Sequence, residues 1–151
     1  MNKKIGVLGG GSWGTALAIL LGKKGYNIDM WLRNKQQCDN ISKSKENTRY
    51  LPGIVIPNNV NVINDIEKTI KGKDIIVLAV PTHAVRNTLK NIKGIIKDNQ
   101  VIVNVAKGIE NNSLCRVSEI VKEEVPNIEY AILSGPSHAE EVAKDTPTDF
   151  F

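Results

Sequence analysis

Three glycines near the start of the 151-residue chain have a spacing that predicts binding chemistry. Gly9, Gly11 and Gly14 fit the pattern G-x-G-x-x-G, directly after the apolar residues 5–8 and directly before an apolar helical pattern. A turn of this kind, between a strand and a helix, is where a dinucleotide pyrophosphate binds. The first glycine permits the turn, the second lets backbone approach the phosphates, and the third lets the helix pack closely. The motif alone is common, so a glycine-rich turn without a ligand is the alternative.

Further candidate residues follow the other predicted strands, where ligands of parallel sheets bind. Arg33 stands where many NAD-binding folds have an acidic residue for the ribose 2′-hydroxyl. An arginine there favours the 2′-phosphate of NADP(H), or acceptance of both cofactors, whereas Asp29 lies mid-strand and should point away. Lys107 precedes Gly108 and could meet a phosphate or a polarised carbonyl. His83 is a candidate acid or base, although a residue that only shapes the pocket is the simpler interpretation.

A second turn, at residues 135–137, also precedes a predicted helix. Ser137 is a candidate N-cap, and the nearby amides could bind an anionic substrate group. The sequence contains no nucleophile–histidine–acid arrangement and no metal-ligand spacing, so we expect no metal site. Cys38 and Cys115 are far apart, which favours a reducing, cytoplasmic location.

The composition narrows the classes of partner. The formal net charge is +4, with 41% hydrophobic, 24% charged and 5% aromatic residues. This is typical of a globular domain, and without a basic tract or aromatic platform we expect no nucleic-acid binding. No window approaches the ~18 apolar residues of a membrane span.

The elements that must position these residues alternate between strand and helix. Residues 49–57 read as a loop or short extended piece, and Thr82 and Ser113 are candidate N-caps. This order predicts an α/β fold of the Rossmann type, a doubly wound parallel sheet with strand order 3-2-1-4-5-6 and helices on both faces. The predicted strands are 4–8, 27–32, 61–63, 74–80, 100–105 and 130–133; the predicted helices are 13–24, 35–45, 65–71, 82–96, 113–124 and one opening at 137.

Five motifs in order resemble the bacterial NAD(P)-dependent glycerol-3-phosphate dehydrogenases. The resemblance covers residues 4–148 and is far more specific than the glycine pattern alone. The motifs are GGGSWGTALA at 9–18, RYLPG at 49–53, AVP at 79–81, AKGIE at 106–110 and GPSHAEEVA at 135–143.

The resemblance implies hydride transfer between NAD(P)H and dihydroxyacetone phosphate, giving sn-glycerol 3-phosphate for phospholipid synthesis. It leaves a homodimer of the full-length enzyme open. It assigns cofactor contacts to Ser12, Trp13, Arg33, Tyr50, Lys107 and Ala139, beside the glycines, and substrate contacts to Lys107, Gly135 and Ser137.

The chain departs from the family at its C-terminal end. Residues 1–151 correspond to the N-terminal dinucleotide-binding domain, whereas the family has a helical substrate domain after it that carries the proton-transfer lysine. This lysine would lie beyond Phe151, and the tail TDFF at 148–151 departs from the small and β-branched residues that the family has there. We therefore expect no catalytic residue within this chain and little turnover by the chain alone. A related hydroxy-acid or ketopantoate-type dehydrogenase, and a non-catalytic NAD(P)-binding module, are the alternatives.

Overall fold

A parallel β-sheet organises the chain. The computed structural model describes residues 2–135 and 137–147, and within them the main sheet has six strands in the order β5-β2-β1-β6-β7-β8. Counted along the chain this is the order 3-2-1-4-5-6, so the predicted doubly wound topology is confirmed. The strands are β1 (Ile5–Leu8), β2 (Ile28–Trp31), β5 (Val60–Ile63), β6 (Ile75–Leu78), β7 (Val101–Asn104) and β8 (Glu129–Ile132).

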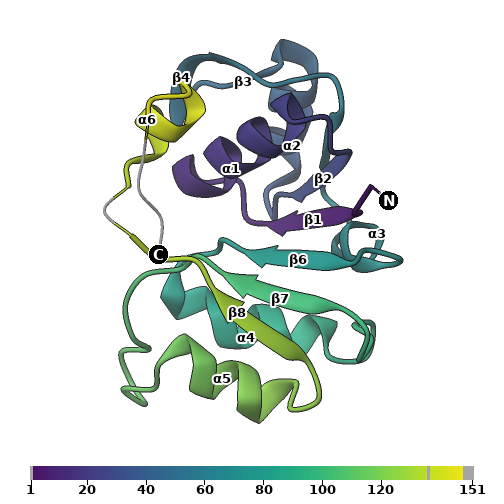
Figure 1. The fold of residues 1–151 in the computed structure, drawn as a ribbon, viewed down its shortest axis with the longest axis vertical. Coiled ribbons are helices and arrows are strands. Elements are labelled where there is room, and N and C mark those ends of the chain that lie inside the picture. The colour runs from purple at the N-terminus through teal and green to yellow at the C-terminus, as the bar shows by residue number, and fades with distance from the viewer. Residues whose placement is uncertain (1, 136, 148–151) are drawn as a thin grey trace.

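Helices cover both faces of this sheet (Figure 1). On one face lie α1 (Ser12–Lys23), α2 (Lys35–Ser44) and α6 (Ala139–Ala143), and on the other lie α4 (Thr82–Ile92) and α5 (Val117–Glu124). The short α3 (Ile66–Ile70) packs into the same core as α4 and α5. None of the described helices is long and apolar enough to cross a membrane.

The central strands are apolar throughout because both of their faces are covered. In β1, Ile5 and Val7 pack under α1, whereas Leu8 faces the core of α4 and α5. In β6, Val77 packs on the α1 side and Leu78 on the opposite side. This two-sided burial fixes the carboxyl ends of β1 and β6, from which the chain departs to opposite faces of the sheet.

A two-stranded hairpin lies where the sequence predicted a loop or short extended piece. Strand β3 (Glu46–Asn47) pairs antiparallel with β4 (Leu51–Val55), beside α1 and α2 (Figure 1). Pro52 and Gly53 read as strand breakers in the sequence, but both are exposed here, as an edge position permits. Leu51 is 1% exposed and joins the core next to α1, which holds the hairpin on the domain.

The three predicted N-caps are wrong. Pro81 occupies the N-cap position of α4, and the Thr82 hydroxyl instead donates a hydrogen bond of 2.6 Å to the carbonyl oxygen of Lys107. Helix α5 begins four residues after Ser113, whose hydroxyl donates to the carboxylate of Glu110. Helix α6 begins at residue 139, so Ser137 lies one position before its N-cap. In the first two cases a distant or neighbouring acceptor binds the hydroxyl in place of the helix amides.

The predicted C-terminal boundary of the domain lies outside the described residues. The sequence predicts that the dinucleotide-binding domain ends at Phe151, and the family resemblance implies that the catalytic lysine lies beyond it. Phe151 and the rest of the tail, 148–151, do not belong to the described part of the chain. Both the boundary and the position of the lysine therefore stay predictions.

Candidate functional site

The loops at the carboxyl ends of the strands enclose a cleft of about 870 Å³. The glycine turn after β1 forms its floor, the segment after β2 and the β3–β4 hairpin line one end, and the turns after β6 and β7 line the other. This is the position at which parallel α/β sheets bind their ligands. Of the residues predicted from the sequence, the cleft is lined by Gly9, Gly11, Ser12, Trp13, Arg33, Tyr50, His83, Lys107, Ser137 and Ala139.

Two predicted residues do not line the cleft. Gly14 is buried inside α1, where it acts on packing rather than on ligand access. Gly135 lies in the turn after β8 with a φ of +152°, and its carbonyl oxygen accepts a hydrogen bond from the amide of Ser137. Asp29 forms an ion pair of 2.5 Å with Lys73 and does not line the cleft, as its mid-strand position predicted.

The three glycines of the motif have three different structural roles. Gly9 has a φ of +119°, and a Cβ there would lie 2.7 Å from the carbonyl oxygen of Ala79. A Cβ on Gly14 would overlap the carbonyl oxygen of Gly9, so this glycine lets the first turn of α1 approach the loop. A Cβ on Gly11 would meet nothing within 4 Å, because it would project into open space at the cleft.

The shape of the glycine turn fits a dinucleotide pyrophosphate. Gly11 ends in extended backbone (φ −74°, ψ −172°) at the N-cap of α1, and no side chain caps this helix. In the described part of the chain, the amides of Gly10 and Gly11 donate to no protein group. Amides left unpaired at a helix N-terminus, with the positive end of the helix dipole behind them, bind phosphate.

The cleft is electropositive. Its lining includes the cationic side chains of Arg33, Arg49 and Lys107, against one carboxylate, that of Glu140. None of these three cations takes part in an ion pair with another described residue. Charges that the protein leaves uncompensated in a cleft attract an anionic ligand.

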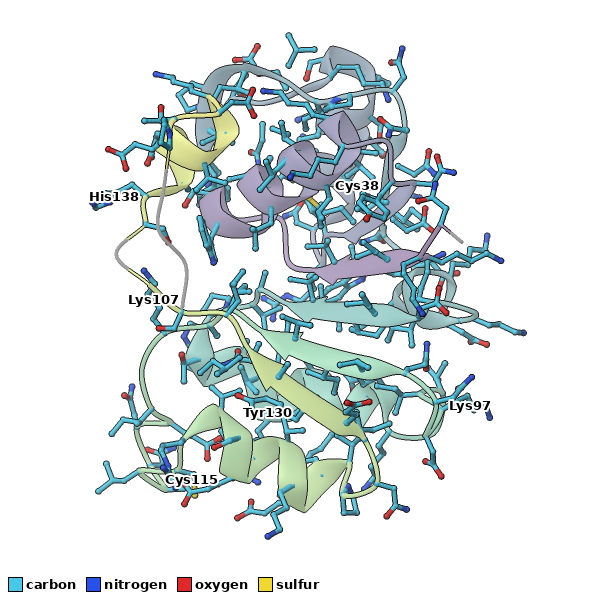
Figure 2. All side chains as sticks on the ribbon, in the orientation of Figure 1. Cys38, Lys97, Lys107, Cys115, Tyr130 and His138 are labelled. Carbon is cyan, nitrogen blue, oxygen red and sulfur yellow. The ribbon has the colours of Figure 1, made fainter. Side chains whose placement is uncertain are left out.

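Lys107 lies in the loop after β7, three residues beyond the strand, on the side facing α1 and α6 (Figure 2). Its ammonium nitrogen is 6.0 Å from the centroid of the Trp13 ring, so the lysine and the start of α1 face each other across the cleft. The loop that carries it is held by the Thr82 hydroxyl at the Lys107 carbonyl and by the Asn104 side chain, which accepts from the amide of Ala106. The glycine that follows has a φ of +103°, which turns the chain sharply after the lysine.

A cluster of charged residues behind this loop was not predicted from the sequence. The guanidinium of Arg86, on α4, donates three hydrogen bonds of 2.9–3.1 Å to the carboxylate of Glu110 and one each to Glu123 and Glu124. These bonds, with that from Ser113, hold the pKa of Glu110 below its ordinary value. The hydrogen bonds with the three glutamates raise the pKa of Arg86. The partners lie 24 to 38 residues apart, so no local spacing could have indicated them.

The hairpin contributes two neighbouring residues to the cleft, Arg49 and Tyr50. Tyr50 is 40% exposed, and the guanidinium carbon of Arg49 lies 5.1 Å from its ring centroid. Tyr50 was the one candidate that followed no predicted strand; the fold of the hairpin over α1 explains why it reaches the cleft. Arg49 was not predicted, and its only signal is its place in the motif that contains Tyr50.

No cluster of three or more histidine, cysteine, aspartate or glutamate side chains in the described residues could hold a metal ion.

Cys38 is buried and Cys115 partly exposed, and both are free thiols. The pKa of the Cys38 thiol is raised, mainly by burial and further by the negative charge of the nearby Asp39.

The chain is similar in sequence to one family of known enzymes. Residues 4–151 match the sequence family described as NAD-dependent glycerol-3-phosphate dehydrogenase N-terminus. The chain is 49% identical over 146 residues to glycerol-3-phosphate dehydrogenase [NAD(P)+] of Clostridium tetani and 51% identical over 141 residues to that of Clostridium acetobutylicum. These alignments cover 97% and 93% of the chain, and the chain spans 42% of the length of each relative.

A solved structure agrees with the sequence comparison. The crystal structure of glycerol-3-phosphate dehydrogenase from Coxiella burnetii superposes with a TM-score of 0.93 at 32% identity. The superposition covers 99% of this chain and 46% of that one. The chain therefore belongs to the NAD-dependent glycerol-3-phosphate dehydrogenase family and corresponds to its N-terminal, dinucleotide-binding part.

Proposed function

We propose that this chain is the cofactor-binding part of an enzyme that interconverts dihydroxyacetone phosphate and sn-glycerol 3-phosphate with NAD(P)H. The observation that carries the proposal is the cleft, in which an open glycine turn, Arg33 and Lys107 meet at the carboxyl ends of the strands. The relatives that share this part of the chain are glycerol-3-phosphate dehydrogenases that use NAD(P)+. The enzyme would supply a precursor of phospholipids in the cytoplasm.

In this proposal each part of the cleft has a different task. The amides of the glycine turn, with Ser12 and Trp13, hold the pyrophosphate, and Gly11 leaves the space that it needs. Arg33 and Tyr50 hold the adenosine end, which leaves the nicotinamide end between Lys107 and Ala139. When bound, the reduced nicotinamide supplies the hydride. The Lys107 ammonium would lie beside the carbonyl oxygen of the substrate, where it stabilises developing negative charge.

The substrate phosphate is assigned to the turn after β8. Ser137 is 9% exposed, lines the cleft and is positioned through its amide by Gly135. In this proposal residues 1–151 form one dinucleotide-binding domain. A helical domain in the remaining length of the full enzyme, beyond Phe151, supplies the catalytic lysine and the other phosphate ligands.

Arg33 favours NADP(H) over NAD(H). It is exposed, lines the cleft and takes part in no ion pair with a described residue, so its guanidinium is available to a 2′-phosphate. Because this phosphate is the only difference between the two cofactors, Arg33 can discriminate between them through one charge-assisted, bidentate contact.

The test is a titration of the chain with NADPH and with NADH, before and after Arg33→Ala. The substitution should weaken NADPH binding by about 1–3 kcal/mol and NADH binding much less. Lys35→Ala is the matched control, because Lys35 is an exposed cation two residues away that does not line the cleft. Equal losses for the two cofactors would refute the assignment of Arg33, and no binding of either cofactor by the wild type would refute the proposed function.

A further inference from the structure

Asn47, in strand β3, has no predicted role, yet its side chain binds the glycine turn. The residue is 1% exposed. Its side-chain nitrogen donates a hydrogen bond of 2.9 Å to the carbonyl oxygen of Gly10 and another of 2.9 Å to the Thr15 hydroxyl. The carbonyl can only accept, which fixes the orientation of the amide with its nitrogen toward Gly10.

The bond to Gly10 controls a group that faces the cleft. In a trans peptide unit the C=O and N–H bonds point in opposite directions. When Asn47 holds the carbonyl of Gly10, the N–H of Gly11 in the same peptide unit must therefore point away from the hairpin. Gly11 lines the cleft, and its amide has no partner among the described residues.

Without this hydrogen bond, few interactions would restrict the backbone conformation of the glycine turn. Three consecutive glycines, Gly9 to Gly11, have more backbone freedom than any other tripeptide sequence. The amide of Gly9 is bound to the carbonyl of Trp31 at 3.1 Å, but no other described residue binds the carbonyl of Gly10. A side chain that immobilises this peptide unit reduces the entropy that ligand binding would otherwise cost.

The same side chain also connects the hairpin, at one end of the cleft, to the glycine turn that forms its floor. Asn47 belongs to the hairpin that carries Arg49 and Tyr50, and it pairs with Leu51 in the hairpin ladder. Its partners Gly10 and Thr15 belong to the glycine turn and the first turns of α1. The hairpin residues at the adenosine end are thus held in register with the turn at the pyrophosphate.

We propose that Asn47 is a positioning residue for dinucleotide binding, which orients the Gly10–Gly11 peptide unit so that the Gly11 amide is aimed at the pyrophosphate. This inference rests on the proposed function and assigns a role that Asn47 performs without touching the cofactor.

The experiment compares Asn47→Ala with Asn59→Ala in the full chain. The side-chain nitrogen of Asn59 donates two hydrogen bonds of 2.8 Å, to the carbonyl oxygens of Gly22 and Tyr26, at the opposite end of α1. Each substitution thus removes an amide that makes two hydrogen bonds around the same helix, and a merely structural role predicts equal effects. We expect similar decreases in melting temperature, a loss of about tenfold in NADPH affinity for Asn47→Ala, and a change within about twofold for Asn59→Ala.

A second variant separates the two bonds that Asn47 makes. Thr15→Val removes the hydroxyl partner but leaves the bond to Gly10, so stability should fall while NADPH affinity stays within about twofold. If Asn47→Ala does not fold, Asn47→Leu carries the same comparison, because it keeps roughly the size of the side chain, lacks the donor and adds no charge beside the pyrophosphate. Asn47 variants with unchanged affinity, or Asn59→Ala or Thr15→Val with an equal loss, would overturn the inference. If the wild type binds no dinucleotide, the proposed function fails first and this inference fails with it.

Discussion

Substitution of two glycines in the same motif should produce opposite phenotypes. Gly11→Ala places a methyl group in the cleft, whereas Gly14→Ala places one against the backbone of the glycine turn. We therefore expect Gly11→Ala to weaken cofactor binding without affecting folding, and Gly14→Ala to destabilise the domain.

The structure gives the size of each effect. Gly11 has a φ of −74° and a ψ of −172°, a conformation open to alanine, and its Cβ would meet no atom within 4 Å. Alanine is a poorer N-cap than glycine, but it also lowers the entropy of the unfolded chain, so the two effects nearly cancel and stability should stay within about 0.5 kcal/mol. In the proposed binding mode the methyl group would occupy the space of the pyrophosphate, so NADPH affinity should fall at least about tenfold, or 1.4 kcal/mol.

The cost of Gly14→Ala comes from overlap with main chain. The new Cβ would lie well inside 3.0 Å of the carbonyl oxygen of Gly9 and 3.2 Å from the Cβ of Ala79. Overpacking of this kind costs about 1–3 kcal/mol, and the upper end applies because a backbone oxygen cannot rotate away. For a chain of this length the melting temperature should fall by roughly 6–12 °C.

The assay is thermal unfolding of each variant without ligand, followed by a fluorescence titration with NADPH well below the lowest melting temperature. Gly25→Ala is unsuitable as a control because Gly25 has a φ of +90°, whereas Gly94→Ala places its Cβ in open space and Gly94 does not line the cleft. Full NADPH affinity in Gly11→Ala would show that the pyrophosphate does not lie on this turn. Wild-type stability in Gly14→Ala would refute the packing argument.

Three further predictions concern pH, turnover and thiol chemistry. Hydrogen bonds from Arg86, and then from Ser113, lower the pKa of Glu110 in the folded state. The stability that the ionised Glu110 contributes is therefore complete above the ordinary pKa of 4.5 and is lost as the pH falls through the lowered pKa. Urea unfolding from about pH 6 to 3 should show a weaker pH dependence of stability in Glu110→Gln than in the wild type. The isolated chain should oxidise little or no NADPH in the presence of dihydroxyacetone phosphate, and appreciable steady-state turnover would contradict the assignment of the proton-transfer group to the rest of the enzyme. Cys115 should be alkylated before Cys38, because Cys38 is buried and its pKa is raised, and mass spectrometry of a time course with iodoacetamide would show the reverse order if this is wrong.

The sheet was predictable because its physical cause is local in sequence. Strands covered on both faces read as short apolar runs, and β1 and β6 show this without a break. The hairpin was not predictable in this way. Pro52 and Gly53 are ordinary signals of a loop, and only the burial of Leu51 and Ile56 next to α1 makes the segment a stable strand pair. The wrong caps have a related cause: the hydroxyls of Thr82 and Ser113 bind the carbonyl of Lys107 and the carboxylate of Glu110, outside the helix start.

The candidate site likewise contains residues that a local sequence pattern predicts and residues that only contacts distant in sequence bring into place. The glycine turn and Lys107 were predicted because each directly follows a strand, and the sheet alone brings such residues to one edge. Asn47 follows no strand of the main sheet, and its partners lie 37 and 32 residues away. No pattern in one sequence connects residues at such distances.

The loops of the cleft are fixed by side chains that do not follow from the sheet. A parallel sheet determines where each loop begins, but not how its peptide units are oriented a few residues later. In this domain Asn47 supplies that orientation for the glycine turn, Thr82 for the carbonyl of Lys107, and Arg86 for the segment that ends at Glu110. Each is a polar side chain on one loop or helix that binds another segment far away in sequence. In the proposed binding mode the amides of the glycine turn hold the pyrophosphate and Lys107 lies at the nicotinamide end, so small rotations of these segments should change affinity directly. Residues that link the loops should therefore affect binding as strongly as residues that line the cleft.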